Sequence, residues 1–119
     1  MINGRIDVFV PSLVSGSGGH TQGELMPEAL RRAQAYLDAG ADCVYPIGLW
    51  EAGALAAFAS KCPGPVNVLR IPQAPSLAEL AELGVARISY AGLLHRGVME
   101  QFSHVLASLA EQREHLRAG

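Results

Sequence analysis

The sequence has little charge and no long apolar run. Its 119 residues carry 9 Lys+Arg and 11 Asp+Glu, which gives a net charge of −2 at pH 7, and Lys61 is the only lysine. Without a basic cluster, the chain lacks the charge that attracts nucleic acid or an anionic membrane surface. No apolar stretch approaches the roughly 20 residues that cross a bilayer, and no basic segment leads into an apolar one as in a secretion signal. We therefore expect a cytoplasmic protein that binds neither nucleic acid nor membranes.

Cysteine and histidine are too few and too scattered to form a recognisable metal site. The two cysteines, Cys43 and Cys62, form no CxxC pair. They are typical of reduced core thiols, although a disulfide between them stays open. The four histidines lack the spacing of metal ligands; they are His20, His95, His104 and His115. The sequence therefore predicts no metal ligand in this chain.

What is present is a regular alternation of strand-like and helix-like segments, in a chain of which 50% is hydrophobic. A glycine- and serine-rich segment, 15–23, is expected to be a loop. The pattern predicts strands at 5–10, 41–48, 66–71 and 85–92, and helices at 28–40, 50–61 and 76–83, with a longer final helix after residue 92.

Local signals mark the helix ends. Ser76 and Glu79 form a capping-box pattern at the start of one helix. Gly40 and Gly84 suit the left-handed conformation that often ends a helix. The charged tail 111–119 is expected to fray.

Strands and helices that alternate with short connections indicate parallel strands joined by right-handed helical crossovers. The strands are nearly continuous apolar runs, as expected where both faces of a sheet are covered. Two architectures fit: a small open sheet with helices on both faces, or part of a (β/α)8 barrel. A full barrel has eight strand–helix units and usually needs about 250 residues. The four units of this chain therefore correspond to half a barrel.

Two charged residues interrupt the first strand. Arg5 and Asp7 are separated by one residue, so on a strand they point to the same face, which in a barrel is the inside. Burying charges without partners is costly, so we expect them to pair or to meet a ligand. An ion pair that only orients the strand and a substrate-binding pair are both open at this point.

Three segments together resemble the isocitrate lyase / phosphoenolpyruvate mutase superfamily. "INGRIDVFV" is similar to the "NARTD" strand of that family, and "ALRRAQAYLDAGADCVYPIGL" to its helix with the following "AGAD" turn and strand. The segment "PVNVLRIPQAPSLAELAELGVARISYAGLLHRGVM" resembles the family's last two strands, running into its last helix. The likeness covers essentially the whole chain in the right order.

The resemblance implies a (β/α)8 barrel of which this chain, as a single domain over 1–119, matches strands five to eight. It also implies a lyase or phosphonomutase that breaks C–C or P–C bonds in small 2-oxo or 2-hydroxy acids. The family uses Mg²⁺. The ligands of this metal and the catalytic loop of the family lie on the first four strands, outside the matched part. The expected ligand is a small anionic carboxylic or phosphonic acid.

The resemblance also implies roles for individual residues. Arg5 matches the arginine of "NARTD", which reaches a carboxylate or phosphonate group of the substrate, and a guanidinium fork suits such anions. Asp7 would orient Arg5 or the water shell of the metal. Asn3 shares the face of Arg5, and Asn67 matches a family asparagine whose amide can address substrate oxygens. Ile47 stands where lyases for isocitrate-like acids often have glutamate, which argues against a standard isocitrate lyase.

Because the family's metal ligands are not in this chain, we expect it to be inactive alone. The alternative is a non-catalytic half barrel that pairs with a second copy or with a partner chain to close the ring. An independent flavodoxin-like module is also open, although no glycine-rich phosphate loop supports it.

Overall fold

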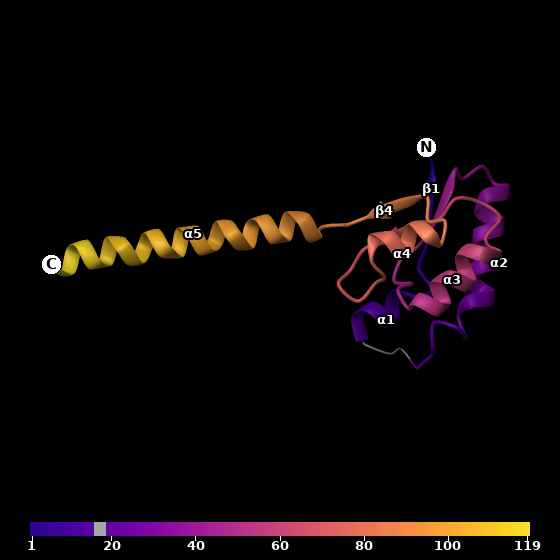
Figure 1. Ribbon diagram of the computed structural model, residues 1–119, viewed down its shortest axis with the longest axis horizontal. Helices are drawn as coiled ribbons and strands as arrows, with labels where there is room; N and C mark the ends of the chain where they lie inside the picture. The colour runs from indigo at the N-terminus through magenta and orange to yellow at the C-terminus, as the bar shows by residue number, and fades with distance from the viewer. Residues whose placement is uncertain (16–18) are drawn as a thin grey trace. The chain divides into compact units, whose positions relative to one another are not determined.

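The computed structural model describes residues 1–15 and 19–119, so part of the loop predicted at 15–23 lies outside the described residues. The elements in chain order are β1 (Asn3–Ile6), α1 (Val10–Ser15), α2 (Met26–Asp38), β2 (Cys43–Pro46), α3 (Ala52–Lys61), β3 (Asn67–Leu69), α4 (Leu77–Glu82), β4 (Arg87–Ser89) and α5 (Leu93–Ala118). This confirms the predicted alternation of strands and helices (Figure 1).

The chain divides into two compact units, residues 1–89 and residues 90–119. The first contains all the strands and helices from β1 to β4, and the second contains α5. The expectation of a single domain over 1–119 stays a prediction.

All strand pairings in the first unit are parallel and follow the order of the chain. β1 pairs with β2, and β3 pairs with β4. A parallel bridge between Val44 and Val66 joins the two pairs. An open doubly wound sheet reverses its strand order at a switch point, whereas the strands of a (β/α)8 barrel follow one another in sequence. The observed order is therefore that of a barrel segment.

The hydrophobic core lies between the strands and the helices. Alternate residues of each strand face the helices, and these include Ile6, Val44 and Val68, each fully buried. α2 and α3 lie next to each other over this face (Figure 1). The helices contribute the buried side chains Ala29, Ala33, Leu55, Phe58 and Leu80.

The first strand is shorter than the sequence predicts, and the predicted range 5–10 is wrong. β1 ends at Ile6, and the amide of Val10 donates to the carbonyl of Asp7 at 3.1 Å to form a turn. The helix α1 then begins at Val10, with Pro11 as its second residue. Proline is well suited to a first helical turn because its missing N–H needs no partner there. This turn overrides the strand propensity of the run Val8–Val10.

The predicted helix signals are confirmed in α4. The amide of Glu79 donates to the hydroxyl of Ser76 at 3.3 Å, and the amide of Ser76 donates to the Glu79 carboxylate at 2.7 Å. Hydrogen bonds from the side chain and from the backbone amide of Ser76 lower the pKa of Glu79, because both favour its charged carboxylate.

Gly48 follows β2 in a conformation that few other residues adopt. Its φ is +90°, and a Cβ placed there would come within 2.7 Å of the carbonyl oxygen of Phe9. That oxygen belongs to the backbone and cannot swing away, so glycine is required where the loop after β2 meets the loop after β1.

The surface of α2 carries a small ion-pair network. Glu28 lies 2.7 Å from the guanidinium of Arg31 and 2.7 Å from that of Arg32. Hydrogen bonds from these two arginines lower the pKa of Glu28 to about 2.

The second unit is one long helix. α5 runs through Ala118, so the tail 111–119 is almost entirely helical, and its fraying stays a prediction. Taken by itself, the helix leaves large apolar side chains exposed at helical spacing; they are Leu94, Val98, Met99, Phe102, Val105, Leu106, Leu109 and Leu116. No described helix is both long and apolar enough to cross a membrane.

Candidate functional site

The strand face opposite the helices carries a row of polar side chains. Arg5 pairs in register with Tyr45, and Asn67 pairs with Arg87. The bridge from Val44 to the residue before Asn67 brings Tyr45 alongside Asn67. Neighbouring residues on adjacent parallel strands point to the same face. One row therefore crosses all four strands in the order Arg5, Tyr45, Asn67 and Arg87.

Arg5 forms the predicted pair with Asp7. Its Nε lies 2.5 Å from Oδ1 of Asp7, and the two side chains are 57% and 56% exposed. The expectation that these charges are buried is therefore wrong for the described chain. An exposed ion pair contributes little to stability, so stability alone does not account for a charged pair on this face.

Asn67 is the most unusual polar residue of the row. It is 1% exposed, and neither its Nδ2 nor its Oδ1 has a hydrogen-bond partner among the residues that the structure describes. Buried polar side chains are nearly always hydrogen-bonded, because an unpaired amide loses its contacts with water without replacement. The N–H donors and the carbonyl acceptor of this amide are therefore without hydrogen-bond partners among the described residues.

Asn3, in contrast, already has a partner. Its Oδ1 accepts a hydrogen bond from the thiol of Cys43 at 3.1 Å, and the side chain is half-buried. Asn3 thus lies on the predicted face but is tied to the neighbouring strand. Of the four predicted site residues, the register places Arg5 and Asn67 in one row. Asp7 is bonded to Arg5, and Asn3 lies on the same face of β1, separated from Arg5 by one residue.

The sequence analysis missed Gln22, which fixes the loop after β2. Gln22 is buried, its Nε2 donates to the carbonyl of Gly48 at 2.8 Å, and its Oε1 accepts from the amides of Trp50 and Glu51 at 3.1 and 3.0 Å. No sequence signal could have found it, because it stands in an irregular loop without periodicity.

Two clefts border Trp50 near this loop. One, of about 300 Å³, also contacts Ser12 and the loop residues Gly19–Gln22. The other, of about 360 Å³, lies between Trp50 and the segment Ile71–Gln73. The first cleft is lined by segments that follow β1 and β2, and the second also by the segment after β3. This is the side where barrels of this kind bind ligands.

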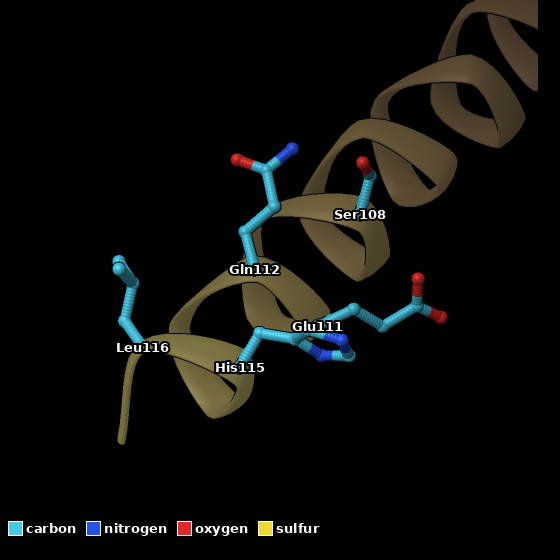
Figure 2. Close-up of a pocket in the computed structure, with 5 residues that line it drawn as sticks. All are labelled: Ser108, Glu111, Gln112, His115 and Leu116. Carbon is cyan, nitrogen blue, oxygen red and sulfur yellow. The ribbon is translucent and has the colours of Figure 1, made fainter. Parts of the chain in front are cut away.

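A further hollow lies along α5, and it lacks the character of a binding site. Its lining residues are Ser108, Glu111, Gln112, His115 and Leu116 (Figure 2). All of them come from one helix and all are exposed. A ligand pocket needs walls from several elements.

The described residues do not fit a bound Mg²⁺. Over 1–15 and 19–119, no group of three or more His, Cys, Asp or Glu side chains comes together as a metal centre would require. The groups that the strand face opposite the helices does present include guanidinium and amide groups, which can donate hydrogen bonds to anionic oxygens.

Comparison with known proteins identifies the class. The model of the phosphoenolpyruvate phosphomutase family matches residues 1–110. The chain therefore belongs to the phosphoenolpyruvate mutase / isocitrate lyase family, as the sequence motifs indicated, and forms part of its barrel domain.

Two uncharacterized proteins of Mycobacterium tuberculosis, from strains CDC 1551 and H37Rv, are each 33% identical to it over 82 residues. Among solved structures, a "putative phosphonomutase" from Burkholderia cenocepacia matches with a TM-score of 0.79 and 37% identity over 91% of this chain. A "putative lyase/mutase" from the same organism matches with a TM-score of 0.71 and 31% identity, also over 91%.

The chain spans only part of these relatives. It covers 31% of the length of the two mycobacterial proteins, and 42% and 36% of the two Burkholderia chains.

Proposed function

We propose that this chain supplies the substrate-anion site of a lyase or phosphonomutase that acts on small 2-oxo or 2-hydroxy acids. The observation that carries the proposal is the buried Asn67 amide without a partner, in the same register row as the guanidinium of Arg5. A guanidinium fork matches the oxygens of a carboxylate or phosphonate, and an amide addresses a neighbouring carbonyl or hydroxyl. The row thus offers complementary groups to a small oxygen-rich acid.

Each site residue then has a defined role. Arg5 holds the carboxylate or phosphonate group, and Asp7 fixes the orientation of Arg5 through their 2.5 Å contact. The Nδ2 group of Asn67 donates to a substrate oxygen, and its Oδ1 accepts from the hydroxyl where the substrate is a 2-hydroxy acid. Asn3 ties β1 to β2 through Cys43 and supports the position of Arg5.

Mg²⁺, which the family uses, would stabilise the enolate-like charge that develops as the bond breaks. Its ligands are expected outside this chain. We therefore propose that the chain alone binds its substrate and does not turn it over.

The test is an assay with phosphonopyruvate and with an isocitrate-type acid, each with and without Mg²⁺, together with calorimetric measurement of binding. We expect binding without turnover, and loss of binding in Arg5→Ala. Arg113→Ala is the matched control, because it removes an exposed arginine of α5 that forms no ion pair with the described residues. Turnover by the chain alone that disappears in Arg5→Ala would contradict the expected inactivity. Equal binding by wild type and Arg5→Ala would contradict the site itself.

A second candidate is a half barrel that assembles with another copy or with a partner chain. The supporting observation is that, among the described strands, β1 and β4 each pair on one side only. Unpaired edge strands favour association with further strands. Light scattering coupled to size-exclusion chromatography over a range of concentrations tests self-assembly: a dimer or larger species is expected, and a monomer at all concentrations contradicts assembly with a second copy.

A further inference from the structure

The row that contains Arg5 and Asn67 ends in a second arginine. Arg87 is the first residue of β4 and pairs in register with Asn67. Adjacent strands lie about 4.8 Å apart. Arg87 is therefore the immediate neighbour of Asn67 on one side, and Arg5 is two strands away on the other.

Arg87 lacks the counter-ion that Arg5 has. Arg87 is exposed, and no carboxylate of the described residues forms an ion pair with it. Arg5, in contrast, is bonded to Asp7. The row thus carries two guanidinium groups against one carboxylate, with an unpaired buried amide between them. This surplus of positive charge and free donors is complementary to a second anionic group.

We propose that Arg87 is a second anion-binding residue, which with Asn67 holds the other anionic group of the ligand whose first group is bound by Arg5. The ligand class is then a small dianion, a dicarboxylate or a carboxylate that carries a phosphonate. Arg87 determines specificity, because it favours the dianion over acids with a single charged group. The proposal rests on the proposed role of Arg5.

Paired probes separate the two roles. Phosphonoacetate carries a phosphonate and a carboxylate, whereas methylphosphonate carries only the phosphonate. Their dissociation constants are measured by calorimetry or by NMR titration at low ionic strength, for the wild type and for Arg87→Gln, Arg5→Gln and the charge-matched control Arg113→Gln. Arg87→Lys is included because it keeps the positive charge and removes only the planar guanidinium fork. It therefore changes the start of β4 less than Arg87→Gln does.

We expect the wild type to bind phosphonoacetate more tightly than methylphosphonate. Arg87→Gln should weaken phosphonoacetate about tenfold or more, since a charge-assisted contact is lost, and should leave methylphosphonate within about twofold. Arg87→Lys should lie between the wild type and Arg87→Gln. Arg113→Gln should change neither ligand.

The outcomes distinguish this proposal from the one on which it rests. If Arg5→Gln weakens both ligands but Arg87→Gln keeps the wild-type preference for phosphonoacetate, the role of Arg87 is refuted and that of Arg5 stands. If Arg5→Gln changes neither ligand, the proposed function fails. The role of Arg87 is also refuted if the wild type does not prefer phosphonoacetate to methylphosphonate. It is refuted as well if Arg113→Gln removes this preference as much as Arg87→Gln does.

Discussion

The unpaired amide of Asn67 predicts that this residue reduces the stability of the chain. Asn67 is 1% exposed and both polar atoms of its side chain lack partners. The substitution Asn67→Leu replaces the amide by an apolar group of similar size. Removing a buried polar group that has no hydrogen bond recovers about 1–3 kcal/mol of desolvation cost. The change of shape costs up to about 1.5 kcal/mol.

Taking the middle of each range, the free energy of unfolding of Asn67→Leu should therefore rise by about 1 kcal/mol. For a domain of 60–100 residues, each kcal/mol raises the melting temperature by about 4–8 °C. Urea unfolding followed by circular dichroism gives the free energy, and differential scanning calorimetry gives the melting temperature. The same variant should lose affinity for phosphonoacetate, because it lacks the amide that we propose contacts the ligand.

Asn3→Leu is the matched control. Asn3 has a partner, since its Oδ1 accepts from the thiol of Cys43 at 3.1 Å, so this change should leave the stability unchanged or lower it by up to about 1.5 kcal/mol. A lower stability of Asn67→Leu would refute the argument, because the amide must then make a stabilising hydrogen bond in solution. If Asn67→Leu is more stable but binds phosphonoacetate as tightly as the wild type does, the binding role of Asn67 is refuted and the stability argument stands.

Other predictions follow from the loop after β2 and from α2. Gly48→Ala should lower the free energy of unfolding by about 2 kcal/mol or more, because a Cβ would lie 2.7 Å from a backbone oxygen. Gly53→Ala in α3 should raise it by about 0.5–1 kcal/mol, because no described atom lies within 4 Å of the added Cβ. Urea unfolding measures both variants. The carboxylate of Glu28 should titrate near pH 2 by NMR. In the double variant of Arg31→Gln and Arg32→Gln its pKa should rise towards the ordinary value of 4.5. Because the pKa of Glu28 is depressed in the folded chain, the stabilisation from its ion pairs is present above pH 4.5 and is lost as the pH falls towards 2. A pKa that stays near 2 in the double variant would contradict the assigned cause.

The sequence predicted the elements whose signals are local. The capping box of Ser76 and Glu79 and the apolar spacing of α2 depend only on nearby residues, and the structure has both elements. The range of β1 was wrong because Pro11 favours a helical turn after Val10, and this outweighs the strand propensity of a short run.

The site was predictable only in part. Arg5, Asp7 and Asn67 came from motif resemblance, while the importance of Arg87 depends on which strands are neighbours and in what register. That register is set by contacts between distant segments, and no local pattern encodes it. Gln22 is a stronger case, since its three hydrogen bonds join residues that lie 26 to 29 positions along the chain.

The two faces of the strands therefore differ in their expected roles: one face stabilises the fold, and the other carries the proposed binding site. On the helix side, Ile6, Val44 and Val68 are fully buried and apolar, so substitutions there should change folding first. On the opposite face, the row from Arg5 to Arg87 contains charges and an amide that the described residues leave partly unpaired. Unpaired groups of this kind lower stability and are retained where a ligand completes them. A variant series on the two faces should consequently separate: helix-side changes should alter the free energy of unfolding in proportion to buried volume, and changes in the row should alter anion affinity with little or even favourable effect on stability.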